Sequence, residues 1–123
     1  MREERGQLSG DQLIFEPFTL WGSIGGDVRV IQGGKFYLRG AIYGNLTVEY
    51  GGRVHVFGNI SGNLIVQRGA KVIHSGVLGG DAVNEGGRLY FDGTAKVMGR
   101  IKTESERAET KTEPGFKHPD LHG

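Results

Sequence analysis

Four histidines, a regularly spaced set of Asp and Asn residues, and one glycine-rich run are the parts of this sequence that could do chemistry. The spacing of the histidines does not bring metal ligands together, so we expect no zinc site. The run at residues 22–26 (Gly-Ser-Ile-Gly-Gly) opens no helix, which a phosphate-binding loop requires. The chain has no cysteine, which excludes disulfides and thiol catalysis. We therefore expect no catalytic residue, no Ser-His-Asp arrangement, no metal and no cofactor. The histidines are His55, His74, His118 and His122.

The Asp and Asn residues recur at a constant spacing, each directly after a glycine. They are Asp27, Asn45, Asn63 and Asp81. A row of carboxylate and amide oxygens could bind Ca²⁺. Asp and Asn after glycine are also common turn residues, which tolerate left-handed geometry and form hydrogen bonds along a stack. We interpret them as turn residues.

A further set of positions combines positive charge with aromatic rings. The first part, the basic column, is Lys35, Arg53, Lys71 and Arg88. The second part, the aromatic column, lies two positions later and is Tyr37, His55, Ile73 and Tyr90. Stacked like charges repel each other. The basic column is therefore either solvated surface, with the repulsion reduced by Glu49 and Glu85, or a docking stripe for an acidic protein or polysaccharide. Nucleic acid is not expected as a partner, because the net charge is only +1.

An 18-residue repeat would stack these side chains. Segments that begin at Gly22, Gly40 and Gly58 align residue by residue, and a fourth that begins at Gly76 is one residue shorter. We place that deletion between Leu78 and Val83. Within each repeat an apolar residue recurs every six positions. These are Phe18, Ile24, Val30, Phe36, Ile42, Val48, Val54, Ile60, Val66, Val72 and Leu78, followed by Val83, Leu89, Ala95 and Ile101.

A period of six predicts short strands and corners, because an amphipathic helix needs spacings of three and four. Three hexads close one coil, so each residue lies about 4.8 Å from its counterpart on the coil before. The predicted fold is all-β: a single-domain, three-faced parallel β-helix, or β-solenoid, with an 18-residue coil and about 4–5 coils. Glycines at positions such as 33–34 and 51–52 would supply the positive φ of one corner.

We predict three regions in the chain. Residues 1–17 form a flexible or capping segment, residues 18–101 form the β-helix core, and residues 102–123 form a charged, disordered tail. The core and assembly residues are Phe18, Trp21, Phe36, Val54, Val72, Leu89 and Ile101. No apolar run is long enough to span a bilayer, and no secretory signal follows Met1, so we expect a cytoplasmic location and leave peripheral membrane contact open.

The repeated unit resembles that of the bactofilins, bacterial cytoskeletal proteins that form polymers. The shared pattern is Gly-x-Ile-x-Gly-(Asp/Asn)-(Val/Leu)-x-Val-x-x-Gly-(Gly/Ala)-(Lys/Arg)-(Val/Phe), which is repeated between residues 22 and 99. The resemblance implies a three-sided β-helix with flexible ends that polymerises end to end without nucleotide.

Three functions stay open on the sequence alone. The first is a self-assembling, head-to-tail structural scaffold, whose open ends would expose apolar core. The second is a monomeric or dimeric module that binds a partner through its basic and aromatic face. The third is an enzyme of the left-handed hexapeptide-repeat family, which shares the period of six. Small residues usually follow the apolar position in that family, whereas Tyr37, Glu49 and His55 do so here. We therefore expect a scaffold and no enzyme.

Overall fold

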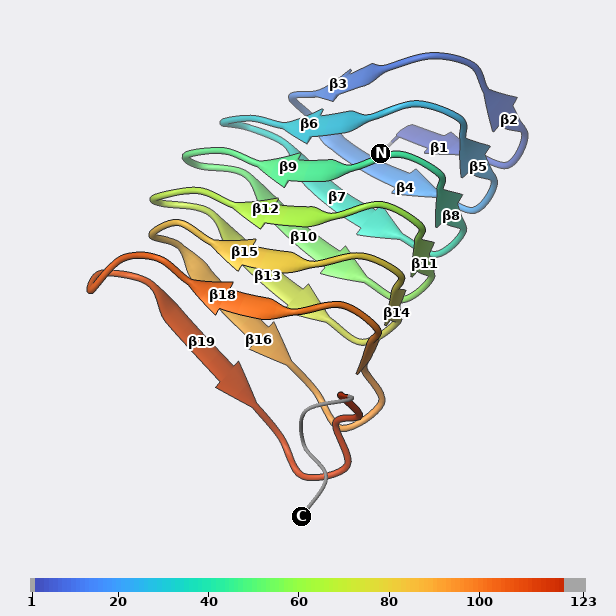
Figure 1. The fold of residues 1–123 in the computed structure, drawn as a ribbon. Helices are drawn as coiled ribbons and strands as arrows, with labels where there is room; N and C mark the ends of the chain where they lie inside the picture. The colour runs from blue at the N-terminus through green and yellow to red at the C-terminus, as the bar shows by residue number, and fades with distance from the viewer. Residues whose placement is uncertain (1, 119–123) are drawn as a thin grey trace.

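The computed structural model describes residues 2–118, which form three parallel β-sheets wound into one solenoid (Figure 1). Sheet A contains β1 (Arg2–Glu4), β4 (Pro17–Leu20), β7 (Lys35–Leu38), β10 (Arg53–Val56), β13 (Lys71–His74), β16 (Arg88–Phe91) and β19 (Glu109–Thr112). Sheet B contains β2 (Gln7–Leu8), β5 (Ser23–Ile24), β8 (Ala41–Ile42), β11 (Asn59–Ile60), β14 (Val77–Leu78) and β17 (Lys96–Val97). Sheet C contains β3 (Gln12–Ile14), β6 (Val28–Val30), β9 (Leu46–Val48), β12 (Leu64–Val66), β15 (Ala82–Asn84) and β18 (Ile101–Thr103).

The core lies between the three sheets and consists of stacked apolar columns. All eleven residues of the period from Phe18 to Leu78 are buried, as predicted. In sheet A, Phe18, Phe36 and Val54 lie in register on successive strands, at the spacing of the repeat. The β-solenoid with an 18-residue coil is therefore confirmed. Sheets B and C have six strands each, which gives about six coils instead of the expected four to five.

The one-residue deletion lies at a different corner from the one predicted. Leu64 still pairs with Ala82 at the full repeat spacing, whereas Val72 pairs with Leu89, one position short of it. The deletion therefore falls after β15 and before β16. As a result Ala82 and Asn84 point inward, and Val83, which the six-residue period assigns to the core, points outward. The prediction is wrong because an apolar residue at position 83 makes the earlier corner look like the shortened one.

The solenoid begins before residue 18. Strands β1, β2 and β3 form a first coil in which Arg2 pairs with Phe18, two positions closer along the chain than in a regular coil. Ile14 precedes Phe18 by four positions, whereas Val30 precedes Phe36 by six. Because the corner between them is two residues shorter, the six-residue period is interrupted and does not reveal this coil.

The solenoid also continues beyond residue 101. Ile101 of β18 pairs with Ala82 of β15, and Glu109 of β19 pairs with Arg88 of β16, so both spacings exceed that of a regular coil. Phe116 then packs on Phe91, with ring centroids 4.8 Å apart, and is buried. Residues 102–112 belong to the predicted charged tail, yet they include most of β18 and all of β19. Their charged, mixed composition and the longer corners hide this periodicity in the sequence. The end of that predicted tail, with His122, lies outside the described residues.

Glycine has two different roles at the corners. Gly33, Gly51, Gly69 and Gly86 have positive φ, as expected for the corner between sheets C and A. The column Gly22, Gly40, Gly58 and Gly76 has no positive φ, and a Cβ added there would lie 1.8–1.9 Å from a backbone carbonyl oxygen of the coil before. Close approach between coils therefore requires these glycines. The Asp and Asn column has no positive φ either, so left-handed geometry does not explain it.

Candidate binding face

The outer surface of sheet A brings the predicted stripe together. Strand pairing places Lys35 beside Arg53, Arg53 beside Lys71 and Lys71 beside Arg88. All four side chains of the basic column are exposed, and the four side chains of the aromatic column are half-buried. Alternation along each strand forces this arrangement, because the residues on either side point into the core. The predicted stacking of the stripe is confirmed by this register.

Two adjoining hollows run along the solenoid between the basic and aromatic columns. The first is lined by Lys35, Phe36, Tyr37, Arg53, Val54, His55, Lys71 and Ile73. The second is lined by Lys71, Val72, Ile73, Arg88, Leu89, Tyr90, Glu109 and Lys111. Because Lys71 and Ile73 line both, the two hollows form one groove across five strands, which we call the axial groove. One wall of the axial groove is cationic and the other is mainly aromatic.

The charges along the groove are not equally compensated. Lys35, Arg53 and Lys71 form no ion pair with any carboxylate of residues 2–118. Glu49, which we expected to ease the basic column, instead pairs with Arg29 at 2.5 Å. The Lys35 ammonium lies 5.8 Å from the centroid of the Tyr37 ring, a cation–π arrangement. Within the described part of the chain, three neighbouring cations therefore face solvent without a counter-charge.

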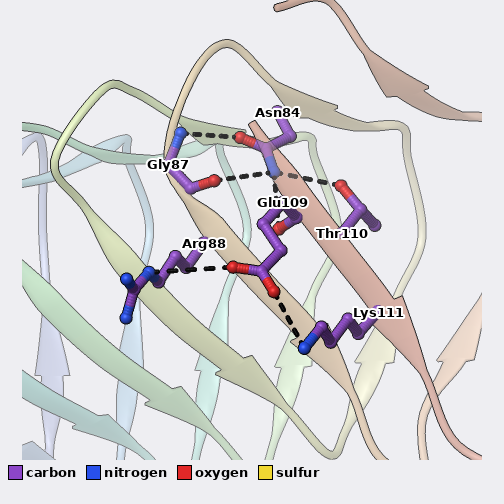
Figure 2. Close-up of polar contacts among 6 residues, drawn as sticks. All are labelled: Asn84, Gly87, Arg88, Glu109, Thr110 and Lys111. Atoms are coloured by element: carbon purple, nitrogen blue, oxygen red, sulfur yellow. Dashed lines mark hydrogen bonds and ion pairs between the residues drawn. The ribbon is translucent and has the colours of Figure 1, made fainter. Parts of the chain in front are cut away.

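Glu109 lines the axial groove at its C-terminal end. Its carboxylate lies 3.8 Å from Arg88 and 2.8 Å from Lys111 (Figure 2). The hydrogen bond from Lys111, with the positive charges of Lys111 and Arg88, lowers the pKa of the Glu109 carboxyl below its ordinary value. The fourth cation of the basic column is therefore already partly neutralised, which sequence analysis did not anticipate.

Asn84 holds the last strand of sheet A in place (Figure 2). Its Oδ1 accepts a hydrogen bond from the Gly87 amide at 2.9 Å, so the side chain completes the shortened corner. Its Nδ2 donates to the Glu109 carbonyl at 3.1 Å and to the Thr110 hydroxyl at 3.0 Å. The buried amide is thus satisfied, and it links β19 to the rest of the solenoid.

A stack of arginine and aromatic side chains lies at the corner after sheet A. The Arg39 guanidinium is 5.0 Å from the centroid of Trp21 and 4.3 Å from that of Phe57. Phe57 stacks on His55 with centroids 3.8 Å apart. Trp21, which sequence analysis groups with the core and assembly residues, is 42% exposed at this corner, and its indole donates a hydrogen bond to Glu3. This stack could have been predicted from the repeat, since Trp21, Arg39 and Phe57 are 18 residues apart and share one column.

No known protein family, curated protein or solved structure matches this chain. The likeness of the repeat to bactofilins therefore rests on the residues quoted above. Residues 2–118 contain no helix of the length and hydropathy needed to cross a bilayer.

His55, Ser75 and Asp92 lie together beside the groove, contrary to our expectation that no Ser-His-Asp arrangement would form. The Ser75 hydroxyl donates to Asp92 and lies 3.1 Å from Nε2 of His55, so His55 donates to it. Burial is the largest influence on His55 and lowers its pKa, so the ring is neutral near pH 7. Burial raises the pKa of Asp92, but the hydrogen bonds from Ser75 and Thr94 lower it by more. Because the Ser75 proton is donated to Asp92 and His55 donates to Ser75, His55 does not accept the serine proton as the base of a catalytic triad would.

The side-chain oxygens of the Asp and Asn column accept hydrogen bonds from backbone amides. Oδ1 of Asp27 accepts from the Asn45 amide at 2.7 Å, and Oδ1 of Asn45 accepts from the Asn63 amide at 2.8 Å. The same contact recurs at Asn63 and Asp81, each with an amide of the next coil. The expected hydrogen bonds along the stack are therefore confirmed. Residues 2–118 contain no group of three or more His, Asp and Glu side chains arranged to hold a metal.

His74 is a buried histidine in the core of sheet A. It is fully buried, and neither ring nitrogen has a hydrogen-bond partner among residues 2–118. Its ring contacts Phe91 edge-on at 5.5 Å. Burial is the main cause that lowers the pKa of His74 to about 4, with the Asp92 charge opposing it and His55 adding to it. His74 continues the inward column of Leu38 and Val56, which hold the same register position on β7 and β10.

We expect a His74→Leu variant to be more stable than the wild type, and increasingly so in acid. The unfolded chain takes up a proton near pH 6.5, whereas folded His74 does so only near pH 4. Stability is therefore lost as pH falls from about 6.5 to 4, by about 3 kcal/mol in total. At neutral pH, removing two unpaired buried nitrogens should add about 1–3 kcal/mol. Urea unfolding of both proteins at pH 7 and pH 5 measures this, and equal pH dependence would contradict it.

Proposed function

We propose that this protein is a structural scaffold that assembles end to end, in the manner of the bactofilins it resembles, without nucleotide and in the cytoplasm. The observation that supports this is that sheet A ends in the edge strands β1 and β19, one at each end of the solenoid. An edge strand presents unpaired backbone groups to a further strand. Pairing of β19 of one copy with β1 of the next is a head-to-tail contact that does not close, so it produces filaments.

The side chains at the two ends make such a joint polar. In β1 the inward positions hold Arg2 and Glu4, and in β19 they hold Thr110 and Thr112, instead of the apolar core expected at open ends. Arg2 lies over the Phe18 ring at 4.5 Å and is 3.8 Å from Glu16. With these polar end strands of sheet A, backbone pairing and charge, more than apolar burial, would hold the paired strands together, so assembly should weaken as salt is added.

The register of sheet A identifies one charge pair for the joint. Glu3 and Lys111 occupy the same outer column, at opposite ends of the sheet. If β1 of one copy continues the parallel register beyond β19 of another, Lys111 faces Glu3. Opposite charges directly across paired strands stabilise the pairing.

Charge reversal at this pair should control filament formation. We expect wild-type protein to form filaments with rising concentration in negative-stain micrographs, and Lys111→Glu or Glu3→Lys to raise the required concentration about fivefold or more. The double variant with both reversals should recover assembly. Arg68→Glu, an exposed reversal at a corner in the middle of the solenoid, serves as the matched control. Strict monomers at high wild-type concentration would show that the scaffold proposal is wrong, whereas filaments indifferent to both reversals would reject only this register.

A further inference from the structure

The axial groove lies on the side of the solenoid, away from the two end edges proposed for assembly. Its basic wall has three adjacent cations, Lys35, Arg53 and Lys71, none of which forms an ion pair within residues 2–118. Pairing of their strands spaces them by about 4.8 Å, a separation at which like charges repel. Among residues 2–118, the one member of the basic column with a carboxylate partner is the next cation, Arg88, which pairs with Glu109. The three cations of the basic wall therefore form a short row that an anionic ligand would neutralise.

The opposite wall offers flat rings beside the cations. Tyr37 and His55 line the groove together with Ile73, and all three are half-buried. Rings held in this way present a rigid apolar surface with a polar edge. A ligand that fits both walls needs an apolar face on one side and a negative group on the other. This combination is repeated along a chain of acidic sugars, whose pyranose rings have a C–H face and a carboxylate or sulfate.

An extended acidic peptide fits the groove less well. Side chains on one side of an extended peptide repeat every 6.4–6.8 Å, roughly, and run out of step with cations about 4.8 Å apart. Strands β7, β10 and β13 are also paired on both sides, so they have no free edge for a peptide strand to join.

We propose that the axial groove binds a linear acidic polysaccharide that runs along the solenoid, with one anionic sugar for each of Lys35, Arg53 and Lys71. The guanidinium of Arg53, at the centre, can hold a carboxylate through two parallel hydrogen bonds. The side chains of Lys35 and Lys71 supply point charges on either side. Tyr37 and His55 form the surface on which the sugar rings lie. The site does not depend on assembly, because one copy contains all of these residues.

The test uses purified protein and three polymers of similar length: polygalacturonate, poly-L-glutamate and neutral dextran. We expect calorimetric titration to show binding of polygalacturonate, binding of poly-L-glutamate about tenfold weaker or less, and no binding of dextran. The double variant Arg53→Gln/Lys71→Gln should lose polygalacturonate affinity by about tenfold or more. The control Lys96→Gln/Lys102→Gln removes the same charge from sheets B and C and should leave the affinity within about twofold.

A second variant separates glycan recognition from simple attraction of polyanions. Tyr37→Leu keeps every charge and should weaken polygalacturonate binding while leaving the weak binding of poly-L-glutamate unchanged. The circular dichroism spectrum confirms that each variant retains its sheet structure. The proposal is overturned if wild-type protein binds none of the polymers, if it binds poly-L-glutamate as tightly as polygalacturonate, or if the Arg53→Gln/Lys71→Gln variant binds like the wild type. Equal poly-L-glutamate binding would instead indicate an acidic protein as the partner.

Discussion

A Phe36→Asp variant is expected to be unfolded at 25 °C. Phe36 is fully buried in the stacked column of sheet A, and its ring lies 5.8 Å from that of Phe18 on the preceding coil. Removing the ring alone should cost about 3–5 kcal/mol. A carboxyl group without a partner in the same place adds several kcal/mol, whether it stays charged or takes up a proton. The sum approaches or exceeds the usual stability of a small domain, about 5–15 kcal/mol.

The matched control places the same residue one position away. Lys35 lies on the same strand but points to solvent, so Lys35→Asp should change stability by about 1 kcal/mol or less. Far-UV circular dichroism and urea unfolding of the two variants measure the contrast. A folded Phe36→Asp protein with a normal unfolding midpoint would contradict the inward column on which the solenoid depends.

A Gly58→Ala variant is expected to lose at least about 3 kcal/mol of unfolding free energy. A methyl group at Gly58 would lie 1.9 Å from the carbonyl oxygen of Gly40 on the preceding coil. That oxygen belongs to the backbone and accepts a hydrogen bond from the Asn59 amide, so it cannot turn away as a side chain could. The two coils would have to separate at this corner, which would weaken the pairing of β11 with β8.

Gly25→Ala is the control for Gly58→Ala. Gly25 also lies in a corner and has no positive φ, but the nearest atom to an added Cβ is the Leu8 carbonyl oxygen, 3.8 Å away. An alanine there should be tolerated within about 1 kcal/mol. Thermal or urea unfolding of both variants provides the comparison. If the two substitutions cost the same, close approach between coils is not the reason for the glycine column.

The two proposals would reinforce each other. Each copy has one row of unpaired cations on the side of the solenoid, within its described residues, so head-to-tail stacking would repeat that row along a filament. A long acidic polysaccharide could then contact several copies at once. Linked contacts raise the apparent affinity well above that of a single groove. Binding measured above and below the assembly concentration would therefore differ for long polymers and agree for trisaccharides.

The repeat alone determined the solenoid and the stripe on its face. Wherever the coil keeps its regular length, residues that share a column are visible in the sequence, because strand pairing repeats the same corner and the same alternation. The apolar columns, the positive-φ glycines and the stacking of Lys35, Arg53 and Lys71 could all be predicted for this reason.

Only the tertiary structure decided the places where a corner changes length. Hydrogen bonds to the neighbouring coil fix which residues pair, and a corner can lose or gain residues without disturbing the strands beside it. A shortened corner explains why Asn84 points inward. Corners of irregular length also explain why the six-residue period does not reveal the first and last coils. Contacts between columns, such as Glu109 with Lys111 and His55 with Ser75, also required the structure. They depend on how neighbouring columns lie next to each other in space, which the repeat period does not specify.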